Sequence, residues 1–183
     1  MDRYVIDGRA SRFTVRAFAT GLLAAMGHNP TIGIRGFGGE MKFNPDKLEA
    51  GLLKITIKSS SLSVQDDISA KDLREMERLM NQEVLETAKF PEILYDASSI
   101  SVSKIADMLY SATLRGKLTL HGVTRGQPLN VRVALLGSML RASGDFTLSQ
   151  TDYDIKLVSV AGGGLKLKDE LKFSFEIMAR RQE

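Results

Sequence analysis

The sequence contains no cysteine, no tryptophan and only two histidines among its 183 residues. The absence of cysteine excludes disulfide bridges, thiolate metal sites and cysteine nucleophiles. A catalytic zinc usually has three protein ligands, so a site here would have to recruit carboxylates such as Asp66 or Asp67. A favourable interaction with the amino terminus of the helix that follows is the simpler role for these two aspartates. We therefore predict no metal site.

Long hydrophobic runs are also missing, since the longest uniformly apolar stretch is Leu22–Met26. A membrane-spanning helix needs roughly 18 such residues, so we expect no integral membrane segment. No basic segment followed by an apolar one precedes the first strand-like residues. This favours a cytoplasmic protein in this numbering, or a periplasmic one if a leader has been removed.

The charge balance gives little support for a nucleic-acid partner. Lysine and arginine exceed the acidic residues by three, no run of five basic residues occurs, and aromatic residues make up 7% of the chain. A protein that binds a single strand needs a basic groove and aromatic stacking surfaces. We predict that the protein does not bind nucleic acid.

Enzyme motifs are absent as well: there is no G-x-S-x-G, no G-x-x-x-x-G-K-[ST] and no H-E-x-x-H. With no cysteine and two histidines, acid–base chemistry would fall to carboxylates, and nothing in the sequence marks which ones. We predict no catalytic residue and no cofactor.

Alternation of apolar and polar residues is the dominant positive feature. Leu53, Ile55 and Ile57 alternate with polar residues, and the same pattern recurs along most of the chain. A period of two is typical of half-buried strands, and about eight such segments can be counted. No linker divides them, which predicts a single all-β domain over residues 1–183. The expected strands cover residues 13–17, 32–43, 53–57, 93–97, 114–120, 129–135, 140–148 and 171–177.

One segment has a different period. Between Ser69 and Glu86 the apolar residues lie three or four positions apart, which predicts an amphipathic helix. Ser69 is a suitable N-cap, with Asp72 three residues later. A shorter apolar piece, residues 19–26, is compatible with one or two helical turns or with a continuing strand. We expect the apolar stripe of the helix to pack on the sheet or across one barrel end; it comprises Leu73, Met76, Leu79, Met80 and Val84.

Antiparallel strands with one helix form either a closed barrel or an open sandwich, and composition does not choose between them. The apolar residues at alternate positions mark the inner face in both cases. From the residues alone, a packed core is the more common outcome for such a face, and a ligand-holding lumen is the alternative.

Several strings, in order along the chain, resemble the YceI-like family. Tyr4–Asp7 with Ser11–Val15 is similar to the family's opening strand pair, and Lys117–Arg125 contains its LTLHGVT hairpin. Lys89–Ile93 is similar to the strand that follows the family's helix, and the segment from Gly144 to Ile155 to a later motif. The resemblance covers nearly the whole chain.

This resemblance implies an extended, eight-stranded antiparallel barrel of lipocalin type with the helix of residues 69–86 beside it. It also implies a hydrophobic lumen that holds a polyisoprenoid or a similar amphiphile, and a homodimer. A barrel of eight strands is about the size at which the interior can hold one small ligand. The expected lumen residues are Phe13, Val15, Ile34, Phe43, Ile55, Ile57, Tyr95, Leu118, Leu120, Phe146, Leu148, Phe173 and Phe175.

The polar ends of such a ligand would meet His28 and His121 if both imidazoles gather at the barrel mouth. The simpler alternative is that each histidine bonds to backbone in a turn. Two positions depart from the family pattern: Gln150 stands where members commonly carry arginine, and Asp154 stands in place of a glycine.

The leading functional hypothesis is binding, storage or transport of a hydrophobic chain, such as a polyisoprenoid, a quinone or a fatty acyl chain, without chemical turnover. One alternative is a lipid-modifying enzyme that uses the histidines and carboxylates at the barrel mouth. Another is an interaction protein with a solid core. A cavity in the structure would separate the third possibility from the first two.

Overall fold

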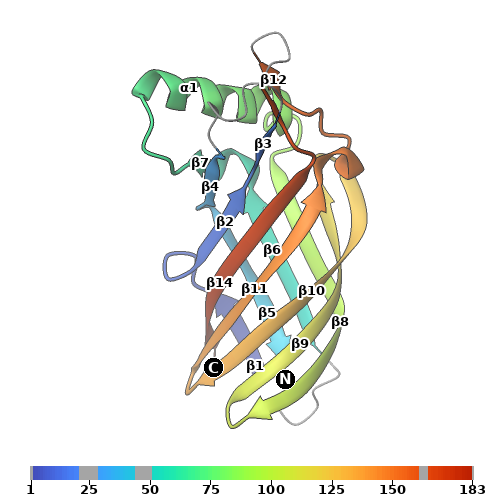
Figure 1. Cartoon of the computed structure of the whole chain (residues 1–183). Coiled ribbons are helices and arrows are strands. Elements are labelled where there is room, and N and C mark those ends of the chain that lie inside the picture. The colour runs from blue at the N-terminus through green and yellow to red at the C-terminus, as the bar shows by residue number, and fades with distance from the viewer. Residues whose placement is uncertain (1, 21–28, 44–50, 161–164, 183) are drawn as a thin grey trace.

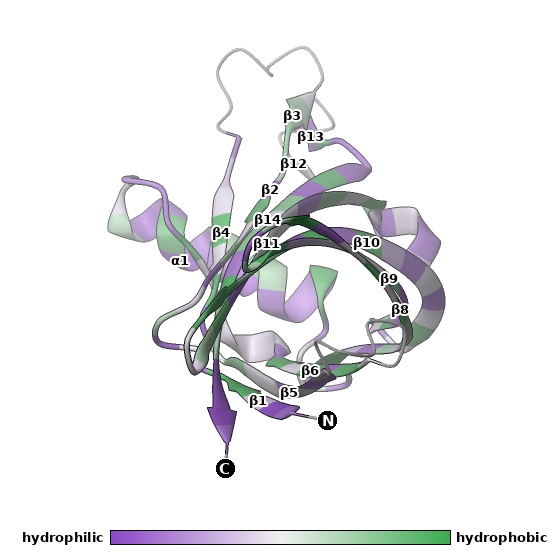
Figure 2. Cartoon of the chain, turned by 90° about the horizontal axis from the view of Figure 1, so that it is seen from below, coloured by the Kyte–Doolittle hydropathy of each residue, from purple (hydrophilic) through white to green (hydrophobic). Residues whose placement is uncertain are grey.

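The computed structural model describes residues 2–20, 29–43, 51–160 and 165–182. Within them the chain closes an antiparallel barrel of eight strands, because β1 pairs with β5 on one side and with β14 on the other (Figures 1 and 2). The all-β class predicted from the alternation is thereby confirmed, and so is the closed eight-stranded barrel that the family resemblance implies. The barrel strands are β1 (Asp2–Ile6), β5 (Phe37–Phe43), β6 (Leu52–Lys58), β8 (Glu92–Ala106), β9 (Leu109–Leu120), β10 (Val123–Leu136), β11 (Met139–Ser149) and β14 (Glu170–Gln182).

Three further strands extend the sheet from β14. They are β2 (Arg12–Arg16), β4 (Thr31–Ile34) and β7 (Leu62–Val64), which follow one another in that order beyond β14. We call these three strands the side leaf. A second, small sheet is formed by β12 (Ser159–Val160), β13 (Leu165–Leu167) and β3 (Ala19–Thr20).

Strand β14 exchanges one partner for another along its length. Residues 172–176 pair with β2, whereas residues 179–182 pair with β1. The Ser11 hydroxyl stabilises this exchange: it accepts a hydrogen bond from the Met178 amide at 2.9 Å and donates one to the Asp7 carbonyl at 2.6 Å. The buried backbone groups between the two ladders are thereby satisfied, as buried polar groups must be.

The single strand expected over residues 32–43 is two strands, and this expectation was wrong. The chain leaves the side leaf after Ile34 and enters the barrel at Phe37. Gly36 lies at the crossing, where a Cβ would stand 2.6 Å from the Cβ of Ser61, and its carbonyl accepts a hydrogen bond from the Lys58 amide. Alternation continues through both strands, so the sequence pattern does not reveal the change of sheet.

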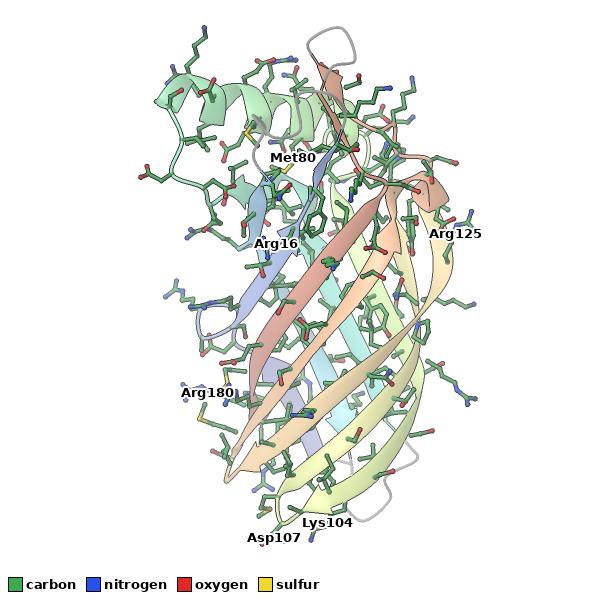
Figure 3. The ribbon with its side chains drawn as sticks, in the orientation of Figure 1. Arg16, Met80, Lys104, Asp107, Arg125 and Arg180 are labelled. Atoms are coloured by element: carbon green, nitrogen blue, oxygen red, sulfur yellow. The ribbon has the colours of Figure 1, made fainter. Side chains whose placement is uncertain are left out.

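The predicted helix is α1 (Ala70–Leu79), continued by a π-helical turn, η3 (Met80–Val84). Ser69 is its N-cap and accepts a hydrogen bond from the Asp72 amide. Asp66 has another role than the one expected near the helix terminus, because its carboxylate accepts a hydrogen bond from the Thr31 amide at the start of β4. The helix lies across one end of the barrel, here called the upper end; the lower end carries the β8–β9 turn with Asp107 (Figure 3).

The helix itself is loosely packed. None of the ten residues of α1 is buried, whereas Met80, at the start of η3, is 7% exposed. The apolar stripe therefore faces the barrel end without being embedded in a close-packed core. No helix among the described residues is long and apolar enough to span a membrane.

The eight described barrel strands leave no edge for a second copy to pair with, whereas β7 is an edge of the described sheet. An eight-stranded barrel that failed to close would expose an edge strand to a second copy, but β1 and β14 pair over four residue pairs, from Arg3 with Gln182 to Ile6 with Ala179. The homodimer stays a prediction that rests on the family resemblance.

The packing difference along the helix gives a prediction. Met80→Ala should lower the free energy of unfolding by about 2–5 kcal/mol, because it leaves a void among buried neighbours. Met76→Ala, one turn earlier on the same stripe, should cost only about 1 kcal/mol, because the Met76 side chain is only partly buried and loses fewer contacts when it is truncated. Urea unfolding of the two variants measures the difference, and equal losses would contradict the loose packing of α1.

Candidate ligand-binding cavity

A large cavity lies between α1, the side leaf and the upper parts of the barrel strands. Its volume is about 550 Å³, within the range of roughly 300–1,000 Å³ typical of small-molecule sites. We call it the upper cavity. Its apolar walls include Val15, Ile32, Ile34, Leu62, Val64, Met76, Leu79, Met80, Val84, Ile93, Leu120, Leu148, Leu171 and Phe173.

A second cavity continues toward the lower end of the barrel. It measures about 110 Å³, which is below the usual size of a ligand site. We call it the lower cavity. Its walls include Ile6, Phe37, Met41, Leu53, Ile55, Tyr95, Tyr110, Leu129, Leu140, Phe175 and Ile177.

The structure brings the predicted lumen residues together on these walls. Every one of them whose side chain is described borders a cavity, and Phe43 lies outside the described side chains. Period two identifies these residues because alternate side chains of a strand point to one face. Contact with a ligand stays a prediction for each of them. The upper cavity is bordered by Val15, Ile34, Leu120, Leu148 and Phe173, the lower by Ile55, Tyr95 and Phe175, and both by Phe13, Ile57, Leu118 and Phe146.

Tyr95 shapes the wall of the lower cavity by lying against a glycine. A Cβ on Gly116, its neighbour on β9, would stand 2.3 Å from the Tyr95 Cζ atom. The phenol donates a hydrogen bond to the Gln127 carbonyl at 3.0 Å. Burial raises the pKa of Tyr95 to about 12, because the charged phenolate would lose its hydration.

Polar groups border the upper cavity at its α1 side. The Asp72 carboxylate accepts a hydrogen bond from the Ser69 hydroxyl at 2.7 Å. Glu75 is paired with Arg78 at 2.8 Å, and the hydrogen bond from this guanidinium lowers the pKa of Glu75. Lys166 lines the same cavity from β13. Charged groups of both signs therefore stand at the upper end, and the described walls below them are apolar or uncharged.

The two departures from the family motif have structural explanations. Gln150 is 3% exposed and borders the upper cavity, and its amide donates a hydrogen bond to the Lys168 carbonyl at 2.9 Å. Glutamine is neutral, whereas the arginine that family members commonly carry here would be a buried guanidinium that needs a charged partner. Asp154 has φ of 55°, in the left-handed region that glycine adopts freely and that aspartate tolerates better than most residues.

His121 lies in a turn and borders neither cavity. With φ of 50° at His121 and 76° at Gly122, these two residues form the tight hairpin loop between β9 and β10. The imidazole Nε2 lies 2.6 Å from the Glu86 carboxylate and Nδ1 lies 3.2 Å from the Tyr153 carbonyl. This arrangement corresponds to the simpler alternative for this histidine. His28 lies outside the described residues.

No cluster of three or more histidine, aspartate or glutamate side chains able to hold a metal ion occurs in the part of the chain that the structure describes. The upper cavity is a mainly apolar chamber with charged groups at its α1 side. Such a chamber can hold an apolar chain by burial and can leave a polar end in water.

Comparison with known proteins agrees with this geometry. The model of the YceI-like domain matches residues 4–179. The chain belongs to the YceI-like family. A comparison with curated proteins finds no significant match.

Several solved structures are similar in fold at low identity. BcnA from Burkholderia cenocepacia aligns with a TM-score of 0.70 at 17% identity, over 94% of this chain and 98% of its own. A polyisoprenoid binding domain from Saccharophagus degradans, implicated in plant cell wall breakdown, aligns with a TM-score of 0.70 at 16% identity, over 98% of both chains. The YceI protein of Campylobacter jejuni aligns with a TM-score of 0.64 at 16% identity, over 85% of this chain and 87% of its own.

The contact between Tyr95 and Gly116 can be tested with a pair of glycine variants. Gly116→Ala should destabilise the protein by about 1–3 kcal/mol, because the added methyl group overlaps the phenol ring. Gly126→Ala on the neighbouring strand is the control, since nothing lies within 4 Å of its added Cβ, and it should be neutral or stabilising by up to about 1 kcal/mol. Equal effects in chemical denaturation would contradict the assigned position of the ring.

The raised pKa of Tyr95 predicts a loss of stability in alkali. The unfolded chain releases the phenol proton near pH 10, whereas the folded protein holds it to about pH 12. The protonated phenol therefore makes its full contribution to the free energy of unfolding below pH 10, and this contribution is lost as the pH rises from about 10 to about 12. Across this range the Tyr95→Phe variant should lose stability less steeply than the wild type. Urea unfolding at several pH values measures both slopes, and parallel slopes would contradict the prediction.

Proposed function

We propose that the protein binds one long hydrophobic chain in the upper cavity, without chemical turnover, and that it stores or carries this molecule. The observation that carries the proposal is a cavity of about 550 Å³ with mostly apolar walls, bordered at the upper end by the loosely packed helix α1. The polyisoprenoid binding domain of similar fold supports an isoprenoid as the class of chain.

Burial alone supplies enough free energy for such binding. Each methylene group transferred from water is worth about 0.8 kcal/mol. A chain that buries about ten of them gains about 8 kcal/mol, which corresponds to a dissociation constant near 1 μM before ordering costs. The walls therefore need no hydrogen bonds to the chain, and they favour apolar length over a particular chemical group.

The polar end of the ligand would lie at the α1 side. Asp72, Glu75 and Lys166 border the cavity there, so this is where a hydroxyl, carbonyl or quinone head group can keep its hydration. Carboxylates on α1 disfavour a second anion beside them. We therefore propose a neutral head group.

The same contacts disfavour the enzyme alternative. Asp72 is bonded to the helix N-cap and Glu75 to Arg78, while His121 lies outside the cavity and contacts Glu86. None of these groups has a partner arrangement that would activate it as a nucleophile or a general base toward a chain in the cavity. The size of the cavity likewise disfavours the solid-cored alternative.

The direct test is to purify the protein without detergent and to analyse it by native mass spectrometry, followed by organic extraction. A bound chain should appear as an added mass that extraction removes and identifies. Protein of unmodified mass that also fails to bind an apolar fluorescent probe would overturn the proposal.

Filling the cavity should abolish binding. Leu148 borders only the upper cavity, so Leu148→Trp should project the larger ring into empty space and block a probe such as N-phenyl-1-naphthylamine with little loss of stability. Phe175→Trp enlarges a wall of the lower cavity only, and should leave probe binding intact.

A second control addresses the head-group role expected for His121, which borders neither cavity. His121→Ala should leave the affinity for the same probe unchanged. In a packed core, Leu148→Trp would instead destabilise the protein by about 1–3 kcal/mol, and fluorescence titration together with thermal unfolding distinguishes the two cases.

A further inference from the structure

The upper and lower cavities meet at four side chains that border both of them. Ile57 and Leu118 stand on β6 and β9, and Phe13 and Phe146 stand on β2 and β11, at either side of β14. We call these four side chains the partition. They mark the level at which the wide part of the lumen ends.

Aromatic contacts hold the two rings of the partition in place. Phe146 is stacked on Phe173, with centroids 4.5 Å apart and planes 11° apart. Phe13 meets Phe173 and Phe175 edge-on, at 6.3 and 6.0 Å, and Phe37 at 6.1 Å. Stacked and edge-to-face pairs attract one another beyond simple burial. A displaced ring would lose several such contacts at once.

A glycine leaves room for this cluster. Gly144 is paired with Phe175 across β11 and β14. A Cβ at this position would stand 2.8 Å from the Phe175 Cζ atom and 2.7 Å from the Asn130 carbonyl oxygen. The absence of a side chain lets the Phe175 ring lie close to β11 at this position.

Below the partition the lumen is long but nearly full. From Leu118 to Tyr110, β9 continues for about 26 Å at about 3.3 Å per residue, and both residues border the lower cavity, which measures only about 110 Å³. Side chains occupy the rest of this length. A chain that passes the partition would therefore have to displace the rings and then find little free volume.

We propose that Phe13 and Phe146 form the floor of the binding site and limit the length of chain that the protein accepts. The inference rests on the proposed function and adds to it a determinant of specificity. A chain that fits the upper cavity buries all of its carbons. A longer chain leaves its excess carbons outside the mouth, where they gain nothing.

The experiment compares prenyl alcohols of increasing length: farnesol, geranylgeraniol and solanesol. Each displaces bound N-phenyl-1-naphthylamine from the wild type and from Phe146→Ala. In the wild type, the affinity for the prenyl alcohols should rise with chain length at first and then stop rising before the longest member of the series. In Phe146→Ala the joined cavities accept more carbons, and each further pair of buried methylene groups is worth about tenfold in affinity. The preference for solanesol over farnesol should therefore increase at least about tenfold.

Phe173→Ala is the matched control. It removes the same ring from a wall of the upper cavity, but Phe173 does not border the lower cavity. It enlarges the upper cavity without removing a side chain shared with the lower one, and should therefore increase the preference for solanesol less than Phe146→Ala does. If Phe146→Ala does not fold, Phe146→Leu opens the partition less and should shift the preference in the same direction.

Crystals pressurised with xenon show whether the two cavities are separate in the absence of a prenyl ligand, because dry apolar cavities bind xenon. The wild type should show separate xenon sites above and below Phe146, and Phe146→Ala should show continuous occupancy. An unchanged chain-length preference in a variant whose cavities have joined overturns the proposal. Equal shifts for Phe146→Ala and Phe173→Ala also overturn it, because added volume would then explain both. If the wild type shows separate xenon sites but binds none of the prenyl alcohols, the proposed function is overturned instead.

Discussion

The exchange of partners along β14 is the constraint from which the rest of the architecture follows. At the lower end β14 pairs with β1, which leads on to β5 and β6 and closes a narrow ring. At the upper end β14 pairs with β2, and the three strands of the side leaf stand where β1 and β5 stand below. Three strands in place of two give the wall a larger circumference. The lumen is wide and empty above and narrow and filled below for this reason.

The same exchange explains why α1 is needed. A widened barrel end exposes apolar wall to water, and a helix with one apolar face can cover it. The cover does not have to be tightly packed, and α1 has no buried residue. Firm packing begins at η3, where Met80 and then Leu85 are buried. Because the helix is held at one end and loosely packed along the rest, the widened end is the route by which the proposed ligand would enter.

Much of this fold could be predicted from the sequence, because period two reports which side chains face inward. The pattern located most of the strands and their inward face, and spacings of three and four located the helix, but the counted segments did not include β1 or β7. It did not report whether the inside is full. Leu118 and Leu140 are both inward-facing leucines on barrel strands, yet Leu118 borders both cavities, whereas Leu140 borders only the lower cavity and is 1% exposed.

Two other features were out of reach for related reasons. The division of residues 32–43 between two sheets depends on which strands meet there, and alternation is the same on both sides of Gly36. The contacts of His121 join the ends of segments that are 35 and 32 residues apart. The hairpin turn, by contrast, depends on local sequence, because it needs a positive φ only at His121 and Gly122.

A molecule bound in the upper cavity as proposed would become part of the protein's own core. Side chains that face a void lack partner atoms on one side, so the unliganded state forfeits dispersion contacts that most cores possess. A guest that fills the void binds the folded chain and not the unfolded one, and raises its stability by an amount that grows with the logarithm of the free guest concentration. Under the proposed function, the stability of the fold would therefore depend on the supply of ligand: a cell poor in the hydrophobic chain would hold a less stable form of this barrel than a cell rich in it.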